Sequence, residues 1–152
     1  LLGRGPAGWV RGQGRLIGLP GWSDRGSGPD CMGGSKSTLL APHEIALRHA
    51  GASYRGRCVG CPPGFPYREG LPKILATPRR ASPRVAVPAG SVAIGGAQTG
   101  IYPLASPGGW NIIGRTPLRL FDVTREPAAL LAAGDRVRLV AVTAEQFRQW
   151  EA

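Results

Sequence analysis

The hydrophobic positions of this chain fall into short runs that glycine and proline interrupt. The clearest run is RVRLVAV at residues 136–142, in which Val137 and Leu139 alternate with arginines, and this period of two predicts a strand. Shorter apolar runs predict further strands of ordinary length at 85–87, 92–94, 110–113 and 117–121, with turns at 88–90 and 114–116. The pattern therefore predicts a mainly β protein.

Helices are expected to be few and short. Residues 42–50, PHEIALRHA, begin with a proline, which the first turn of a helix tolerates. A closing helix is predicted at 145–151, since Thr143 and Gln146 have the spacing of a capping box and Phe147 and Trp150 share one side. One helical turn is expected at 126–133. Residues 1–27 show no sustained period and predict no element.

Two segments have the composition of binding loops. Residues 62–70, PPGFPYREG, place three prolines around Phe65 and Tyr67, which predicts a rigid loop that is either a packed corner of the core or the wall of a pocket. Residues 95–100, GGAQTG, allow close approach of the backbone to a ligand, and Gln98 and Thr99 offer an amide and a hydroxyl. A tight bulge without a ligand would have the same composition.

Composition and charge narrow the class of protein. The chain has 152 residues, enough for one domain, and 42% of them are apolar despite 24 glycines and 15 prolines, which favours a turn-rich β fold over disorder. The net charge of +10 comes almost wholly from arginines scattered through turns, so nucleic-acid binding is not predicted. The segment ATPRRASPR at 76–84 could instead bind a carboxylate or a phosphate, although solvated arginines are the simpler interpretation.

The cysteine count and the lengths of the apolar runs indicate the expected cellular location. Three cysteines are an odd number, and the opening residues lack a signal-peptide pattern, so a reducing cytoplasmic setting is expected. No apolar run approaches the roughly 20 residues that cross a bilayer, so no membrane association is expected.

No self-contained catalytic or metal site is predicted. Cys58 and Cys61 have the spacing of a redox pair or half a zinc site, but the chain lacks a second pair, and two small residues in a strand are the simpler interpretation. GGSKST at 33–38 lacks the glycine that a P-loop needs directly before its lysine. His43 and His49 lie six residues apart, off a common helix face, so both are expected to be surface or capping histidines. Catalytic residues stay unknown, and no metal is expected.

Several long motifs resemble one family in the right order. They are PGFPY (63–67), TPRRASPR (77–84), VPAGSVAIGGAQTGIYPLASPGGWNIIGRTPLRLFD (87–122) and LLAAGDRVRLV (130–140). In these blocks the chain resembles the B subunit of bacterial ATP-dependent 5-oxoprolinase, a family also named allophanate hydrolase subunit 1, carboxyltransferase-domain subunit or Kip-type kinase inhibitor. Gly28-Pro29-Asp30 and His49 extend the resemblance weakly, to about residues 28–147.

The resemblance implies a fold and a domain plan. A cyclophilin-like β-barrel with short peripheral helices is expected, as a carboxyltransferase-type domain over residues 28–152, with residues 1–27 unassigned and irregular. The family's smaller N-terminal α/β domain has no counterpart here, which suggests an N-terminally truncated copy. The chain departs from the family at 31–43, CMGGSKSTLLAPH, and at Cys61 and Arg68, where large apolar residues are usual.

The resemblance also implies a function in a complex. The chain would be a non-autonomous subunit of an ATP-hydrolysing enzyme that converts 5-oxo-L-proline to L-glutamate, with a homologous C subunit and a LamB/YcsF-type A subunit. The complex would bind ATP with Mg, and no cofactor is expected on this chain alone. The alternatives are a regulatory protein that inhibits a sporulation-type histidine kinase, and a subunit of a urea- or allophanate-metabolising amidohydrolase or carboxylase.

Three groups of candidate site residues follow. The expected substrate contacts are Gln98, Thr99 and Tyr102. The residues expected to bind anionic groups are Arg79, Arg80 and Arg84, and the expected apolar walls are Phe65 and Trp110.

Overall fold

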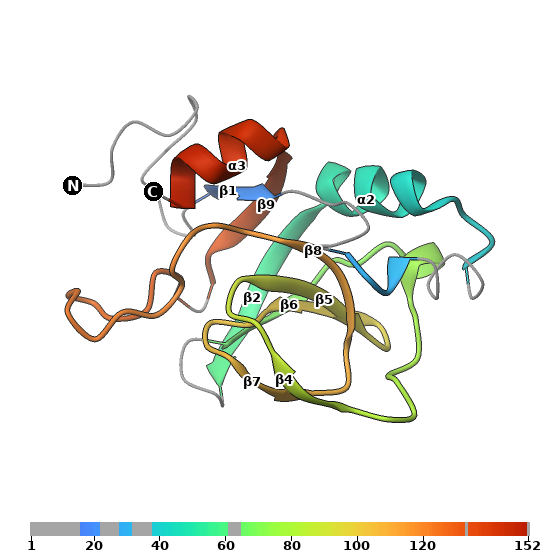
Figure 1. Cartoon of the computed structure of the whole chain (residues 1–152), viewed down its shortest axis with the longest axis horizontal. Helices are drawn as coiled ribbons and strands as arrows, with labels where there is room; N and C mark the ends of the chain where they lie inside the picture. Colours follow the sequence, from blue (N-terminus) through green and yellow to red (C-terminus); the bar gives the residue numbers. More distant parts are fainter. Residues whose placement is uncertain (1–15, 22–27, 32–37, 61–64, 133, 152) are drawn as a thin grey trace.

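Nine strands and two α-helices make up the part of the chain that the computed structural model describes, which is residues 16–21, 28–31, 38–60, 65–132 and 134–151 (Figure 1). The mainly β class predicted from the sequence is confirmed. The strands are β1 (Leu16–Gly21), β2 (Ser53–Gly60), β3 (Phe65–Glu69), β4 (Arg84–Val87), β5 (Ser91–Gly95), β6 (Gln98–Ile101), β7 (Ser106–Gly108), β8 (Asn111–Arg115) and β9 (Arg136–Ala141). The helices are α2 (Pro42–Gly51) and α3 (Ala144–Glu151), with a 3-10 turn at Lys73–Leu75.

Seven strands form one sheet in the order β1-β9-β2-β3-β6-β5-β8, and β4 and β7 form a separate pair. The pairing of β1 with β9 is parallel, and the other pairings are antiparallel. The first and last strands of this order approach each other, because a Cβ on Gly21 of β1 would lie 4.0 Å from the carbonyl oxygen of Arg115 in β8. The sheet is therefore rolled, as strand twist favours.

Both faces of β5 are buried, so the core has two parts. Val92 and Ile94 point into the larger cluster, which also contains Ile45 of α2 and Val137 of β9. Ala93 points to the other face, where a smaller cluster lies close to β4. Its members are Val87, Ala93, Tyr102, Trp110 and Ile112. The alternation of successive side chains along a strand produces this division.

Both helices begin where the sequence predicts. In α2 the Glu44 carboxylate accepts a hydrogen bond of 2.8 Å from the backbone N–H of Ala41, and proline occupies the first turn. In front of α3 the capping box is complete: the N–H of Thr143 donates to Gln146 Oε1 at 2.9 Å, and the N–H of Gln146 donates to Thr143 Oγ1 at 3.2 Å. Phe147 is buried on the inner side of α3. No helix among the described residues has the length and apolar character needed to span a membrane.

The pairing of the central strands differs from the prediction. The strands at 85–87 and 92–94 exist as β4 and β5, but β4 pairs with β7 and β5 pairs with β6 and β8. The intervening Gly90 donates to the Tyr102 carbonyl and accepts from the Thr116 N–H, so it joins neighbouring segments and does not close a hairpin. The predicted turn at 114–116 is wrong in its first half, since Gly114 and Arg115 continue β8 opposite β5.

The predicted strand at 117–121 and helical turn at 126–133 are both wrong. Among the described residues of this segment the regular pairing is an isolated bridge between Phe121 and Ala129. The guanidinium of Arg125 donates to the carbonyl oxygens of Arg119, Leu120 and Ala128, at 2.9–3.4 Å. A loop folded around one arginine satisfies these carbonyls without helix or sheet.

Several predictions fall at the edge of the described residues. Of the rigid loop expected at 62–70, residues 65–69 form β3 and pair with β2, and the fixed φ of Pro66 is compatible with the extended backbone of a strand. The side chains of Phe65 and Tyr67 lie outside the described residues, as do the Cys58–Cys61 spacing and most of GGSKST. Within residues 1–27, where no element was predicted, β1 pairs with β9.

Candidate functional site

A short segment at residues 28–31 holds a carboxylate against the edge of β8. The backbone N–H of Asp30 donates to the Ile112 carbonyl at 3.0 Å, and Asp30 Oδ2 accepts from the Ile112 N–H at 2.7 Å. Gly28 permits this approach, since a Cβ there would lie 2.5 Å from the Ile113 carbonyl oxygen. The thiol of Cys31 donates to the same Ile113 carbonyl at 3.4 Å. The segment thus fixes the position of the Asp30 carboxylate.

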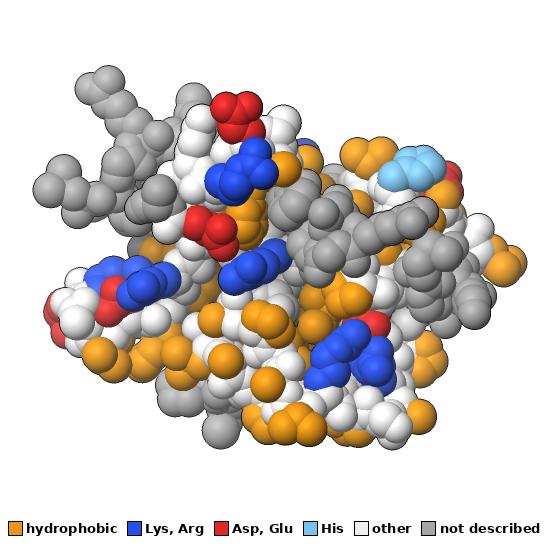
Figure 2. Space-filling view, in the orientation of Figure 1, with side chains coloured by type: hydrophobic (Ala, Val, Ile, Leu, Met, Phe, Trp, Pro, Cys, Tyr) orange, Lys and Arg blue, Asp and Glu red, His pale blue; other side chains and the backbone are white. Residues whose placement is uncertain are grey.

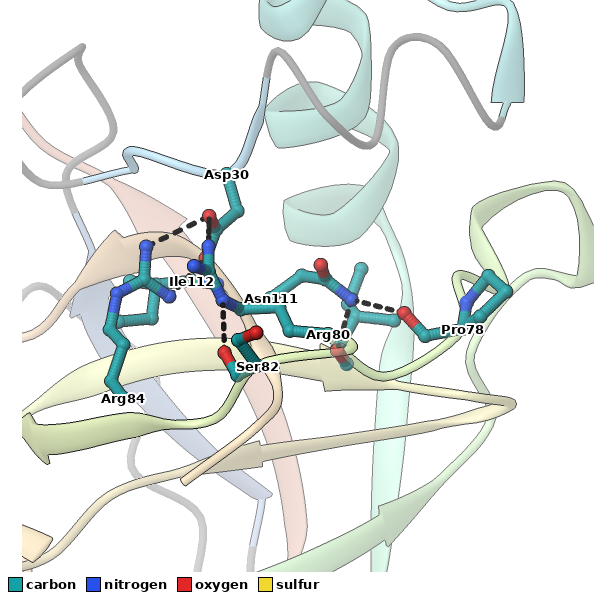
Figure 3. Close-up of polar contacts among 8 residues, drawn as sticks. Asp30, Pro78, Arg80, Ser82, Arg84, Asn111 and Ile112 are labelled. Atoms are coloured by element: carbon teal, nitrogen blue, oxygen red, sulfur yellow. Dashed lines mark hydrogen bonds and ion pairs between the residues drawn. The ribbon is translucent and has the colours of Figure 1, made fainter. Parts of the chain in front are cut away.

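Two arginines from the segment 77–84 converge on Asp30 (Figure 3). Arg84 binds both carboxylate oxygens, Nη1 to Oδ2 at 2.7 Å and Nη2 to Oδ1 at 2.9 Å, while Arg80 Nη1 donates to Oδ1 at 2.8 Å. The Asp30 side chain is 9% exposed, against 35% for Arg80 and 24% for Arg84. We call Asp30, Arg80 and Arg84 the Asp30 cluster.

The cluster keeps Asp30 ionised. Burial alone would raise the pKa of Asp30, but the hydrogen bonds from Arg84 and from the Ile112 N–H, with the charges of Arg84 and Arg80, outweigh burial and hold the pKa below its ordinary value. The hydrogen bond to Asp30 raises the pKa of Arg84 in turn, burial opposes that rise, and the charge of Asp30 and the nearby Tyr102 add to it.

The backbone of the arginine segment is itself anchored. The N–H of Arg80 donates to the Gly109 carbonyl at 2.7 Å, and Thr77 forms a bridge with Gly96. Asn111 Nδ2 donates to the Pro78 carbonyl at 2.8 Å and to the Ile94 carbonyl at 3.2 Å, so it links the segment to β5 (Figure 3). The arginines therefore project from a fixed support.

Arg79 points to a different partner. Its guanidinium carbon lies 5.8 Å from the centre of the Trp110 ring, a cation–π distance. Trp110 is 6% exposed, and Gly95 packs so closely that a Cβ there would lie 2.5 Å from the ring. Two predicted site residues, one cationic and one apolar, are thus brought together beside the Asp30 cluster.

The local charge balance suits an anion. Asp30 offers one negative charge to Arg80 and Arg84, and Arg79 is exposed on the same segment, so positive charge is in excess. On the face shown in Figure 2, Lys and Arg side chains lie in separate small groups with hydrophobic side chains between them. The excess at the arginine segment is therefore local, and a small anionic group fits it better than a long polyanion.

The predicted substrate contacts lie on β6 and directly after it. Gln98 is exposed, whereas Thr99 and Tyr102 are 2% and 4% exposed. The hydroxyl of Thr99 donates to the Ala93 carbonyl at 2.9 Å and lies 2.8 Å from His49 Nε2. Because the hydroxyl proton goes to Ala93, His49 Nε2 is assigned as the donor to Thr99. Gln98 and Thr99 are neighbours that point to opposite faces of β6.

The prediction that both histidines are surface or capping residues is wrong for His49. Its side chain is 2% exposed, and its ring stacks on Tyr54 with centroids 4.9 Å apart. The Tyr54 hydroxyl donates to the backbone carbonyl of His49 at 2.7 Å. His49 follows Ile45 by one turn on the face of α2 that packs against the sheet, which explains its burial; His43 is exposed as expected.

Asp30 and Asn111 are the site residues that the sequence did not identify. A signal for Asp30 existed, since it ends the Gly28-Pro29-Asp30 motif and only nine acidic residues are available to 19 Lys and Arg. No such signal marked Asn111. In the described part of the chain, no three His, Cys, Asp or Glu side chains lie close enough together to hold a metal ion.

Comparisons with known proteins place the chain in a family. The family described as "Carboxyltransferase domain, subdomain C and D" matches residues 6–131. The chain is 40% identical over 137 residues to the B subunit of 5-oxoprolinase from Bacillus subtilis, and 48% identical over 128 residues to its counterpart from Haemophilus influenzae. These matches cover 90% and 84% of this chain, and the chain spans 57% and 60% of the length of the two relatives.

Solved structures similar to this chain agree with the family match. The crystal structure of the uncharacterised protein PH0987 from Pyrococcus horikoshii superimposes with a TM-score of 0.84 at 39% identity, over 87% of this chain and 61% of that one. The urea amidolyase of Kluyveromyces lactis shares the fold alone, with a TM-score of 0.70 at 20% identity over 90% of this chain and 10% of that one. By the extent of the family match and the identity to its relatives, this chain belongs to the carboxyltransferase-domain family, subdomain C and D.

Proposed function

We propose that this chain is a non-autonomous subunit of a cytoplasmic, ATP-dependent 5-oxoprolinase complex that hydrolyses 5-oxo-L-proline to L-glutamate. Its proposed partners are a homologous C subunit and a LamB/YcsF-type A subunit. The observation that carries the proposal is the identity of 40–48% to relatives named as the B subunit of 5-oxoprolinase.

The arrangement of polar groups supports a role within a complex. In the described ranges, the buried Asp30 carboxylate binds the partly exposed Arg80 and Arg84, and the buried side chains of His49 and Thr99 bind each other. Such groups position a surface and do not offer a nucleophile with its own base. A chain of this kind contributes one wall of a site that a partner completes.

The arginine segment would bind the negative charge of the reaction. A lactam in an unstrained ring resists attack by water, and ATP supplies the phosphoryl group that activates its oxygen when ATP is bound to the complex. Arg79, Arg80 and Arg84 fit this charge because they outnumber Asp30 and are at least partly exposed. The donor set fits an anionic oxygen, and Asp30 fixes the direction of two of the three guanidinium groups.

The other predicted residues have proposed roles around this segment. Gln98 is exposed beside the turn that precedes β6, where its amide can reach a substrate. Thr99 and Tyr102 are buried and would act indirectly: Thr99 would hold β6 in position, and Tyr102 would hold the surroundings of Arg84. Trp110, which lies under Arg79, and Phe65 would supply apolar walls.

A segment exchange tests the proposal. In the 5-oxoprolinase B subunit of Escherichia coli, the region that aligns with this chain, 128 residues at 47% identity, is replaced by the present sequence. The hybrid is mixed with the A and C subunits, and glutamate and ADP are measured with and without 5-oxoproline. We expect ATP hydrolysis that requires 5-oxoproline and all three subunits.

Controls separate a failed exchange from a wrong function. The unmodified B subunit must be active in the same mixture, and the hybrid must co-purify with the C subunit. A hybrid that assembles but forms no glutamate would contradict the proposal, and inhibition of histidine kinase autophosphorylation by the same hybrid would favour the regulatory alternative.

A further inference from the structure

A small pocket lies where α2 crosses the seam of the rolled sheet. Its volume is about 150 Å³, and it is apart from the arginine segment. One wall comes from α2, and the others come from β5, β8 and β9 with the end of β1. The lining residues with a role in the argument are Ala46, His49, Ile113, Arg115 and Leu139.

The inner part of this pocket is apolar. Ile113 and Leu139 belong to the larger core cluster and are 4% and 9% exposed, and Ala46 adds a small side chain from α2. An apolar cavity of about 150 Å³ is large enough for a six-membered ring such as benzene. The pocket therefore has room for a compact ring.

One cation lines the same pocket and is only loosely held. Arg115 is 44% exposed in its side chain, and its Nη2 lies 3.7 Å from Glu151 Oε1, which is longer than a hydrogen bond. Its guanidinium carbon lies 5.9 Å from the centre of the Phe147 ring. A ligand carboxylate can displace so weak a partner, because a charge-assisted, two-pronged bond to arginine is stronger.

We propose that this pocket binds a small monocarboxylate whose body is a five- or six-membered ring. The ring lies against Ile113 and Leu139, and the carboxylate binds Arg115 in place of Glu151. His49 closes one wall and is kept in place by its bond to Thr99. The class of ligand follows from the pocket alone. It does not depend on the proposed function, which places 5-oxoproline against the arginine segment and not in this pocket.

Calorimetric titration of the chain with cyclopentanecarboxylate at low salt tests the inference. The matched probe is cyclopentanecarboxamide, which has the same shape without the charge. We expect the carboxylate to bind and the carboxamide to bind at least about tenfold more weakly, the effect of one charge-assisted contact.

Four variants localise the binding. Arg115→Gln should weaken carboxylate binding about tenfold. Arg115→Lys should keep part of the affinity, since lysine retains the positive charge but lacks the paired donors of a guanidinium group. Glu151→Gln should tighten binding about twofold, because a surface ion pair is weak but competes for Arg115. Ala46→Leu should abolish binding by filling the pocket.

The control variant is Arg48→Gln, an exposed position of α2 outside the pocket lining, which should bind like the parent chain. Circular dichroism of every variant excludes unfolding as the cause. Any of three results would overturn the inference: the parent chain does not bind the carboxylate, it binds the carboxamide equally well, or Arg115→Gln binds the carboxylate with full affinity. Because these titrations need neither ATP nor partner subunits, their failure leaves the test of 5-oxoprolinase activity separate.

Discussion

Arg84 donates hydrogen bonds to both carboxylate oxygens of Asp30, at 2.7 and 2.9 Å, although 54 positions separate the two residues in the sequence. This pair, with Arg80, joins the segment 28–31 to the segment 77–84 across β8. Its effect on stability can be measured directly.

Asp30→Asn should destabilise the fold by about 2–4 kcal/mol, since it leaves two partly buried arginines and the Ile112 N–H with a weaker acceptor. Urea unfolding followed by circular dichroism measures the change. Asp122→Asn is the matched control, because the Asp122 carboxylate bonds within its own turn, to Thr124, and its loss should matter much less. Equal losses in both variants would contradict a special role for the cluster.

The same pair predicts acid sensitivity. The folded-state pKa of Asp30 lies below its unfolded value, so its stabilisation is complete above about pH 4 and is lost as the pH falls through the folded pKa. Urea midpoints between pH 7 and pH 2 should fall more steeply for the parent chain than for Asp30→Asn. Asp122, whose pKa is lowered by hydrogen bonds from Thr124, contributes to both curves, and their difference isolates Asp30. Parallel curves would refute the assignment.

Thr99→Val should cost about 1–3 kcal/mol, because it removes a buried hydroxyl and leaves both His49 Nε2 and the Ala93 carbonyl without this partner. Thr99→Ser keeps the hydroxyl and should cost only about 1 kcal/mol for the lost methyl group. Chemical denaturation ranks the two. If serine proves worse than valine, packing and not hydrogen bonding governs the site.

Gly95→Ala should destabilise by about 1–3 kcal/mol, since its Cβ would overlap the Trp110 ring, which is buried and cannot move freely. The thermal midpoint should fall accordingly. Gly51→Ala is the control, because nothing lies within 4 Å of the added methyl group there. A tolerated Gly95→Ala would mean that the Trp110 ring can shift.

Arg79→Gln should separate function from stability. The Arg79 side chain is solvent-exposed over the Trp110 ring, so stability should change by less than about 1 kcal/mol. In the reconstituted hybrid complex, KM should rise about tenfold if this guanidinium binds an anionic group of the reaction. Arg119→Gln, at another exposed arginine, should leave KM unchanged. Identical kinetics in the two variants would remove Arg79 from the site.

The elements that the sequence predicts correctly are those whose signals are local. The alternation in β9 and the capping box of α3 depend on residues a few positions apart, and both are confirmed. The pairing of β4 with β7 is not local, because Gly90 bonds to Tyr102 and Thr116 and not across a hairpin. Likewise the burial of His49 depends on the sheet beneath α2, which a spacing argument on the helix alone does not include.

The arginine segment shows the same limit at the level of the site. Its composition predicts guanidinium groups that bind an anion. In the structure the anion is a carboxylate of the same chain, since Asp30 binds Arg80 and Arg84. The composition of residues 76–84 contains no information about a carboxylate some 50 positions earlier. Whether these arginines also bind a substrate stays a prediction.

The place of β9 in the sheet bears on where this domain can be cut. The family match ends at residue 131, yet β9 at Arg136–Ala141 lies between β1 and β2 and bonds to both. A shortened chain that stopped at the match would lose an interior strand and expose two unpaired edges, which invite aggregation. Any excised or fused version of the domain must therefore retain the residues beyond the family boundary through Ala141.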